Sequence, residues 1–424
     1  MKKRPYRAVR VKQVNVDRLS EEVGDDHIVF GVDVGKEDCF GWLQNRGSDS
    51  HMVIRWKNPQ ESRQVVGLLK DLGSHRVEVA MEPSGSYGDP VRSLFWGAEI
   101  PVYRVSPKRS HDAVEVFDGV PSSHDAKSAG IVARLHMEGT SQLWEEHSEA
   151  GRDLRAGVDV MDMFEERLQR GWGRMEGAMA RYWPEIGAYL DFDGATFLEL
   201  LMRYGGPRQI GAEAEQARVK MRKTGGPLLS EEKIEQVLSS CRETIGVEMT
   251  AEEVVAVKHL AADMRKVVQE LREAKRRVER LSRGNESIEA MAPAVGKMTA
   301  AVLVALGGDP AEYLSGTHWQ KGLGLNLKER SSGKHIGRLK ITKRGSGEAR
   351  RYLYLATLRM INRDIVVRAW YQKKVIRDGG VKMKAIVAIM RKLAKALWYV
   401  AQGQEFDSSK LFDVKRLGLE FSAV

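Results

Sequence analysis

The sequence predicts an α/β domain in its N-terminal third and a largely helical remainder. Between residues 27 and 137, short runs rich in β-branched and aromatic residues alternate with stretches of helical periodicity. From about residue 141 onward, apolar residues instead recur at the three-four spacing of amphipathic helices. A chain of 424 residues is too long for one ordinary domain, so we expect two or three.

The N-terminal block begins with three consecutive strand-like runs, HIVFGVDV, DCFGWLQ and HMVIRW. After them we expect a helix (61–72), a strand (76–81), a helix (88–97), a strand (100–105) and a closing helix (125–137). Three strands followed by alternating helices and strands is the element order of a ribonuclease-H-like fold, although spacing alone also permits other α/β sheets. We expect this domain to span residues 27–140, after a flexible basic arm of residues 1–26.

The helical region, residues 141–286, contains one clean heptad seam. Thr250 and Glu253 form a capping box in front of it. The apolar residues at the a and d positions are Val257, Leu260, Met264, Val267, Leu271, Ala274, Val278 and Leu281. An internal helical hairpin and an intermolecular coiled coil explain this seam equally well. A C-terminal domain of residues 287–424 follows.

The charge of the chain favours a polyanionic partner. The formal net charge is +10, which suits nucleic acid better than a membrane surface. No run of about 18 apolar residues exists, so we expect no membrane partner and a cytoplasmic, nucleoid-associated protein. Two cysteines, Cys39 and Cys241, are too few for a disulfide framework or a zinc cluster, and we expect both to be reduced and structural.

The C-terminal domain carries two further signs of nucleic-acid binding. The stretch APAVGKMTAAVLVAL resembles a helix-hairpin-helix turn, whose backbone amides can meet a phosphate, although a plain packing unit is nearly as good an explanation. From Lys321 onward, basic residues far outnumber acidic ones, which suits contacts with a phosphate backbone. The aromatic residues among them, suited to base stacking, are Tyr352, Tyr354, Trp370, Tyr371, Trp398 and Tyr399.

Three carboxylates of the α/β domain suggest a magnesium site. Asp33 stands in an apolar strand, where a carboxylate is costly unless it is paired or binds a metal. Glu82 ends a second apolar strand, and Asp125 opens the closing helix, where its ordinary role would be an N-cap or first-turn charge. Magnesium takes such hard oxygen ligands and can clamp the oxygens of a phosphoryl transfer.

The loop KERSSGKHIGRLKITKRG, Lys328 to Gly345, combines adjacent serines with a basic surround. By itself it is best explained as a phosphate-binding loop without covalent chemistry. A serine hydroxyl attacks a phosphate only when a base or a metal activates it. The loop offers no obvious base except His335, so a metal held by the first domain is the alternative activator.

Motifs from both halves of the chain together resemble the DEDD transposases of the insertion-sequence 110 family. In the first half these are GVDVGKE, MEPSGSY, the Ser106-Pro107 step and SSHDAKSA. In the second half they are APAVGKMTAAVLVALGGDP, GLGLNLKERSSGKHIGRLKITKRGSGEARRYL and AIMRKLAKALWYVAQGQEFD. The resemblance runs from about residue 27 to 410 and is weakest between about 185 and 250, which we interpret as a subfamily elaboration.

The resemblance implies a RuvC-like domain with a Mg²⁺ site, a coiled coil that forms a dimer or tetramer, and a C-terminal domain with a nucleophilic serine. It implies a bacterial enzyme that cuts and rejoins donor and target DNA through a phosphoserine intermediate, guided by a structured bridge RNA. Carried over by position, Asp33, Glu82 and Asp125 are catalytic metal ligands. Ser332 is the nucleophile, or Ser331 if the alignment shifts by one residue. The residues expected to bind nucleic acid are Lys328, Arg330, Lys334, Arg338, Lys343 and Arg344.

The chain departs from the family pattern at the fourth acidic position. The pattern resembles K-T-D-x-x-D-A, whereas here Ser123-His124-Asp125-Ala126-Lys127-Ser128-Ala129 places a serine, Ser128, where the second acid would stand. A hydroxyl can hold a metal-bound water but brings no charge. We expect a working three-carboxylate site. The alternatives are a site that borrows Asp118 or Asp112, and an inactive copy.

Two competing functions come from other classes. One is a non-catalytic nucleic-acid-binding relative of a transposase, which Ser128 would favour. The other is an actin-like or sugar-kinase-like phosphotransferase, since GVDVGK could be a phosphate-gripping turn. That alternative needs a second glycine-rich loop and an adenosine motif, which the sequence lacks, and no G-x-x-x-x-G-K-[ST] loop occurs either.

Overall fold

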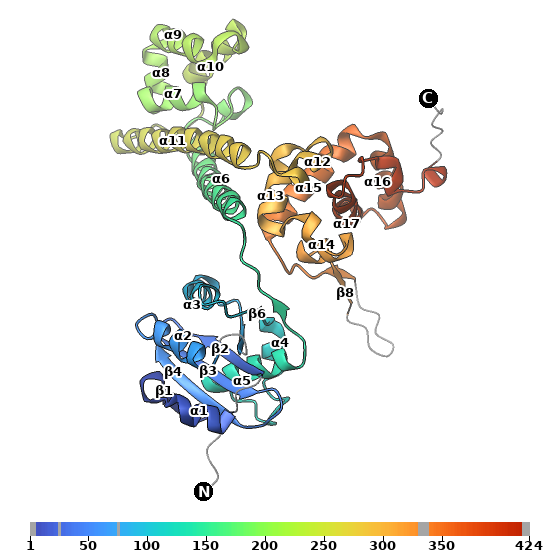
Figure 1. Cartoon of the computed structure of the whole chain (residues 1–424). Coiled ribbons are helices and arrows are strands. Elements are labelled where there is room, and N and C mark those ends of the chain that lie inside the picture. Colours follow the sequence, from blue (N-terminus) through green and yellow to red (C-terminus); the bar gives the residue numbers. More distant parts are fainter. Residues whose placement is uncertain (1–5, 24–26, 74–76, 330–338, 418–424) are drawn as a thin grey trace. The chain divides into compact units, whose positions relative to one another are not determined.

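The structure, a computed structural model, describes residues 6–23, 27–73, 77–329 and 339–417 (Figure 1). The chain divides into two compact units, Met1–Glu146 and His147–Val424. The first is an α/β domain, and the second consists almost entirely of helices. The predicted mixed α/β sheet followed by a helical remainder is therefore confirmed.

The first unit is built on one seven-stranded sheet of order β1-β4-β3-β2-β5-β6-β7. Its strands are β1 (Ala8–Arg10), β2 (Ile28–Val34), β3 (Asp38–Asn45), β4 (His51–Lys57), β5 (Val77–Met81), β6 (Val102–Arg104) and β7 (Gln142–Leu143). Strands β2, β3 and β4 form the predicted antiparallel meander. Strand β5 then pairs parallel to β2, and β6 pairs parallel to β5. A ribonuclease-H-like assignment stays a prediction.

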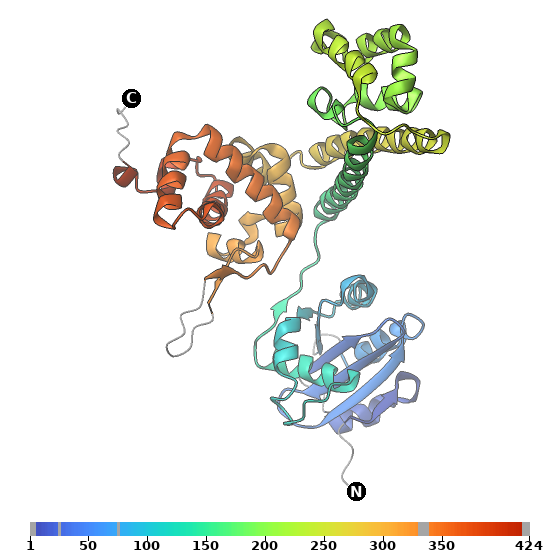
Figure 2. The same ribbon diagram turned by 180° about the vertical axis from the view of Figure 1, so that it is seen from behind.

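Helices cover both faces of this sheet (Figures 1 and 2). They are α1 (Val16–Val23), α2 (Ser62–Asp71), α3 (Asp89–Trp96), α4 (Pro107–Asp112) and α5 (Asp125–Met137). Alternate residues of β2 serve the two faces, because successive strand residues point in opposite directions. Phe30 and Val32 join the core formed with α2 and α3, while Val29 joins the core formed with α5.

Helix α5 lies unusually close to β2, and Gly31 permits this. A Cβ atom at Gly31 would overlap the backbone carbonyl oxygen of Ala129 and the backbone nitrogen of Ala133. Only the absence of a side chain therefore lets the helix backbone rest on the central strand. This close approach brings the first turn of α5 toward the end of β2.

The expectation of a flexible arm over residues 1–26 is wrong for the part that the structure describes. Strand β1 pairs in parallel with β4, with Ala8 opposite Val53. Leu19 of α1 is completely buried, and Val11 and Val23 join the same core. The basic residues of this segment dominate its composition, but its apolar residues complete one edge of the sheet.

In the second unit, the long helices α6 (Glu149–Tyr182) and α11 (Ala251–Leu281) pack as an antiparallel pair. Gly157 lies against Leu281, and Gly171 lies against Met264, so the two helices run in opposite directions. The predicted capping box of Thr250 and Glu253 starts α11. Between these helices in the sequence come α7 (Ala195–Tyr204), α8 (Pro207–Ala212), α9 (Ala214–Gly225) and α10 (Glu231–Glu243).

The apolar residues of the heptad seam pack against other helices of the same chain. Val257 and Met264 are buried in the core shared with α7–α10, and Leu271 and Val278 are buried in the core shared with the C-terminal helices. The structure thus favours the internal hairpin over the intermolecular coiled coil. An oligomer built through this seam has no support here, and any oligomer remains a prediction.

The remaining helices form one bundle around α17. They are α12 (Glu286–Val295), α13 (Lys297–Gly307), α14 (Gly316–Gly322), α15 (Gly347–Arg363), α16 (Ile365–Arg377) and α17 (Lys382–Ala401). Ile389, Leu393 and Leu397 of α17 are completely buried, as its amphipathic pattern predicts. Gly296, with φ +87°, makes the turn between α12 and α13 where the helix-hairpin-helix turn is expected. Among the described residues, no helix has the length and apolar character needed to span a bilayer.

Candidate active site

Asp33 and Glu82 stand at the same edge of the sheet because β2 and β5 are parallel neighbours. Val32 pairs with Met81, so the next residue of each strand is one of the two predicted carboxylates. Asp33 shares its face of β2 with Val29 and Gly31, the face that α5 covers. The carboxyl ends of parallel strands are where functional groups of α/β sheets usually meet.

Asp125 approaches this edge as the first residue of α5. The N-cap of the helix is His124, whose imidazole Nδ1 accepts a hydrogen bond from the Lys127 backbone amide at 3.2 Å. Asp125 therefore does not serve as the N-cap, and its carboxylate is exposed in the first turn. There the positive end of the helix favours a negative charge.

The pKa of Asp33 reports that the three carboxylates lie close together. Burial, and then the negative charges of Asp125 and Glu82, together raise the pKa of Asp33 to about 6. Of the described residues, none forms an ion pair with Asp33. An uncompensated group of carboxylates at a sheet edge is a recurrent feature of functional sites, because a proton or a cation must neutralise it.

The chemistry of these donors fits a hard divalent cation, but their oxygens do not converge as tightly as bound ligands would. Among the described residues, the three acidic side chains whose oxygens all lie within 4.8 Å of one another are Asp162, Glu165 and Glu348 instead. A cation at the sheet edge would therefore have to draw Asp33, Glu82 and Asp125 closer together. Side-chain rotation at the exposed Asp125 is the smallest change that could do so.

The tighter acidic cluster is better explained as an ion-pair network than as a metal site. Glu165 lies 3.1 Å from the Lys275 ammonium and also pairs with Arg351, which in turn pairs with Glu348. The Tyr352 hydroxyl donates a further hydrogen bond to Glu165 at 3.2 Å. These cations lower the pKa of Glu165 despite its burial. The network ties α6, α11 and α15 together.

The two carboxylates that could replace a fourth acid are engaged elsewhere. Asp118 accepts hydrogen bonds from the Lys127 ammonium at 2.8 Å and the Tyr6 hydroxyl at 2.7 Å, which lower its pKa to about 2. Asp112 pairs with Lys108. Ser128 itself is half-buried, with its hydroxyl 3.4 Å from that of Ser123. The site therefore contains three carboxylates.

The predicted nucleophile belongs to a segment that the structure does not describe. Ser331, Ser332 and His335 lie outside the described residues. So do three of the predicted nucleic-acid ligands, namely Arg330, Lys334 and Arg338. The segment 330–338 is bounded by a short antiparallel pair, β8 (Leu327–Lys328) and β9 (Lys340–Ile341), in which Lys328 lies opposite Lys340. Lys328, Lys343 and Arg344 are all exposed, as nucleic-acid contacts require.

The base of this hairpin is held by two glycines in left-handed conformations. Gly324 has φ +72°, and a Cβ there would overlap the Arg344 carbonyl oxygen. Gly345 has φ +114°, and a Cβ there would overlap the Gly322 carbonyl oxygen. The Arg350 guanidinium donates to the carbonyl oxygens of Leu323 at 3.2 Å and Gly345 at 3.1 Å. These contacts join the described residues on either side of the β8–β9 pair to α14 and α15.

The aromatic residues of the C-terminal domain are mostly unavailable for base stacking. Tyr352 is buried, Trp370 stacks on Phe412, and the Trp398 indole donates to the Tyr313 carbonyl oxygen at 2.9 Å. Tyr399 is the exception, with 50% of its side chain exposed. The other rings are half-buried and pack partly against the core, so base stacking by them stays a prediction.

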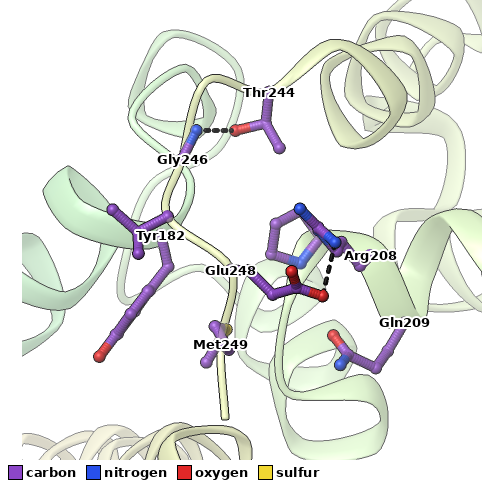
Figure 3. Close-up of a pocket in the computed structure, with 9 residues that line it drawn as sticks. Tyr182, Arg208, Gln209, Thr244, Gly246, Glu248 and Met249 are labelled. Atoms are coloured by element: carbon purple, nitrogen blue, oxygen red, sulfur yellow. Dashed lines mark hydrogen bonds and ion pairs between the residues drawn. The ribbon is translucent and has the colours of Figure 1, made fainter.

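The second unit contains a separate polar pocket (Figure 3). It is lined by Tyr182 at the end of α6, by the start of α8, and by the segment 244–249 that precedes α11. The Arg208 guanidinium and the Glu248 carboxylate, 2.6 Å apart, face each other across it. The Gln209 side-chain oxygen at its wall has no hydrogen-bond partner among the described residues. The pocket is small and suits one or a few waters, so we assign it no function.

A family model of known transposases matches part of the C-terminal domain, including the region around residues 330–338. The family model described as "Transposase IS116/IS110/IS902 family" matches residues 289–372, from α12 into α16. The matched region includes the α12–α13 turn and the β8–β9 hairpin. This part of the chain is similar to that transposase family.

A curated relative supports the same family over a longer stretch. The chain is 23% identical over 298 residues to the "Insertion element IS110 uncharacterized 43.6 kDa protein" of Streptomyces coelicolor. The alignment covers 68% of this chain and 72% of that protein. The predicted resemblance to this transposase family is thus confirmed by both comparisons.

Sequence reasoning missed the residues that position the site. Gly31, Gly324 and Gly345 have no chemical signature, and the Tyr6–Asp118–Lys127 network joins residues far apart in the sequence. The glycines could have been suspected, because an isolated glycine in a strand often marks a close backbone approach. Nothing in the sequence shows which partner approaches.

Proposed function

We propose that this transposase is a bridge-RNA-guided recombinase that cuts and rejoins donor and target DNA through a transient phosphoserine linkage. The observation that supports the proposal is the parallel register of β2 and β5, which places Asp33 and Glu82 at one edge of the sheet. Asp125 lies close enough to contribute, with burial and Glu82, to the raised pKa of Asp33. An edge with three uncompensated carboxylates suits phosphoryl transfer, in which a divalent cation stabilises the attacking and leaving oxygens. The guide RNA is carried over from the family resemblance alone.

In this proposal each residue has a defined task. Asp33, Glu82 and Asp125 would hold Mg²⁺, which when bound would polarise the scissile phosphate. The Ser332 hydroxyl loses its proton and forms a bond to phosphorus, while the bond from phosphorus to the leaving sugar oxygen breaks and that oxygen gains a proton. Lys328, Lys343 and Arg344 hold the flanking phosphates. The phosphoserine ester keeps the energy of the broken phosphodiester, so religation needs no ATP.

The proposal requires the carboxylates and the serine to act on one phosphate. In the proposal, the contacts of Arg350 and of the two glycines, which fix described residues flanking β8 and β9, would help to restrict the nucleophile. A positioned nucleophile gains much of its reactivity from such restriction.

Covalent trapping tests the proposal. The purified full-length chain, its RNA, a donor–target DNA pair and Mg²⁺ are combined, and protein–DNA adducts are sought on a denaturing gel. We expect adducts with the wild type, none with Ser332→Ala, and none with Asp33→Asn, although RNA binding by Asp33→Asn should be unchanged. An adduct that persists in Ser332→Ala but disappears in Ser331→Ala would move the nucleophile by one residue. The absence of both adduct and recombinant product from the wild type would sink the proposal.

The alternative is a non-catalytic DNA-binding relative, which Ser128 in place of an acid would favour. It predicts that the chain binds DNA and RNA but forms no protein–DNA adduct. It also predicts that Asp33→Asn changes neither DNA binding nor RNA binding. The same gel, read beside a binding assay, separates the two functions.

A further inference from the structure

The turn between α16 and α17 exposes large apolar side chains. Ile376, the penultimate residue of α16, is 81% exposed. Val381 and Met383, at the start of α17, are 44% and 54% exposed. Single exposed apolar residues are ordinary on protein surfaces, but three at one short turn make that turn a candidate contact surface.

Backbone hydrogen bonds define the turn between α16 and α17, and the two glycines at its tip face open space. Gly379 and Gly380 adopt left-handed φ values of +67° and +84°, and a Cβ at either would meet no atom within 4 Å. The Gly380 amide donates to the Val375 carbonyl oxygen at 2.9 Å, and the Gly379 amide donates to the Ile376 carbonyl oxygen at 3.1 Å. The turn therefore closes α16 in a defined conformation, and none of the residues that the structure describes packs over its glycines.

Helix α17 is anchored close to the turn. Ala385 and Ile389 are completely buried, and Ile386 is nearly so. Helix α16 is buried instead at its other end, through Val366 and Val367. The start of α17 can therefore bear the force on an inserting side chain.

The charge around the tip is strongly positive. Between residues 365 and 401 the sequence has nine lysines and arginines and one acid, Asp378. Asp378 is already paired with Lys374 and lies 3.8 Å from the Arg377 guanidinium. Lys382 and Lys384, which flank Met383, are both exposed. The surroundings of the apolar tip therefore complement a polyanion.

We propose that the α16–α17 turn is a wedge that inserts Ile376 and Met383 between base pairs of duplex DNA while Lys382 and Lys384 contact the adjacent phosphates. Isoleucine and methionine are among the side chains that proteins insert into the minor groove, where they unstack a base step and kink the duplex. Flanking cations hold the backbone against the wedge. This surface lies outside the residues assigned to the chemistry, and it would deform the DNA on which the transposase acts.

DNA distortion tests the wedge without any dependence on catalysis. The full-length chain is mixed, in the presence of a metal chelator, with duplex DNA that carries 2-aminopurine and a donor–acceptor dye pair at its ends. We expect the wild type to raise the 2-aminopurine fluorescence and shorten the end-to-end distance. The double variant Ile376→Ala/Met383→Ala should lose most of both signals while its DNA affinity falls less than about threefold.

The lysines should behave differently from the apolar pair. Lys382→Gln/Lys384→Gln should weaken DNA binding about tenfold or more and reduce the slope of log affinity against log salt by about two, since each phosphate contact contributes roughly 0.9. Leu228→Ala is the matched control, because Leu228 is 96% exposed on another part of the second unit. It should change none of these measurements.

Three results would overturn the wedge. Full bending and unstacking by the Ile376→Ala/Met383→Ala variant would show that the side chains do not insert. A fall in solution mass caused by the same variant would assign the patch to a second copy of the chain. Binding to anionic phospholipid vesicles that needs Ile376 and Met383, without an effect on DNA shape, would assign it to a membrane surface. The chemistry is not part of these measurements, so a failed wedge leaves the phosphoserine proposal standing, and the reverse also holds.

Discussion

Replacing Asp33 with asparagine should stabilise the chain in the absence of metal, although the same change should abolish strand transfer. The pKa of Asp33 is raised from 3.8 to about 6, chiefly by burial and then by Asp125 and Glu82. The folded state therefore binds this proton more tightly than the unfolded state. Stability is lost as the pH rises from about 4 through about 6, and the loss is complete above that range.

The size of the effect follows from the shift. A pKa difference of this size corresponds to about 3 kcal/mol of unfolding free energy if no solvent screening is allowed for. We take about half, ~1.5 kcal/mol, because the side chain is only partly buried and solvent screens the charges. For a unit of this size, such a gain raises the unfolding temperature by roughly 3–6 °C. The gain should shrink as the pH approaches 4, where Asp33 is protonated in the folded state.

Calorimetry of the full-length chain in chelator, at pH 8 and near pH 4, measures this directly. Asp38→Asn is the matched control, since Asp38 opens the adjacent strand β3 but is paired with Lys57 at 2.8 Å and Arg55 at 3.3 Å. The Lys57 hydrogen bond lowers the pKa of Asp38, so that its substitution should destabilise the chain at pH 8. If Asp33→Asn lowered the unfolding temperature at pH 8 while Asp38→Asn behaved as expected, the repulsion among the three carboxylates would be refuted.

Three further predictions address the metal, the hairpin and the helical pair. Millimolar Mg²⁺ should raise the unfolding temperature of the wild type but not of Asp33→Asn; an equal rise in both would place the ion elsewhere. Gly345→Ala should introduce about 1–3 kcal/mol of local strain and reduce adduct formation at least tenfold. Gly347→Ala is its control and should leave adduct formation unchanged, because the new Cβ would meet only the tip of Arg350 at 3.8 Å. Leu271→Ala should lower stability by about 2–4 kcal/mol without changing the solution mass measured by light scattering, because its seam is filled within the chain; a loss of oligomer would restore the intermolecular coiled coil.

The sequence predicts the α/β domain well because local and long-range preferences agree there. The closing helix begins and ends at the predicted residues, Asp125 and Met137, since His124 caps it and the apolar pattern ends with it. Strands β2 and β5 are apolar runs bounded by polar turns, so their ends, and with them Asp33 and Glu82, could be placed from the sequence. That the two residues lie at one edge depends on the parallel pairing of β2 with β5, which the apolar runs alone do not show.

Other features depend on tertiary contacts that no local pattern encodes. Strand β1 has only three residues, and it pairs with β4, more than 40 positions away. So short a run gives a weak strand signal, and the basic residues around it led to the prediction of a flexible arm. The seam of α11 is chemically compatible with a partner from the same chain or another chain, and only the packing against α6 decides between them. Trp370 and Trp398 sit among lysines in the sequence but on the inner face of their helices.

The serine at the fourth acidic position gains a physical explanation from the state of the other three. Asp33 is already strained by two neighbouring negative charges, and a fourth carboxylate at Ser128, one helical turn from Asp125, would add repulsion. A hydroxyl there can hold water at the edge without this cost. The three remaining acids still reduce the stability of the metal-free chain, and a protein that only binds DNA would have no reason to keep such strain. A working three-carboxylate site therefore stays our prediction, and covalent trapping with Asp33→Asn tests it.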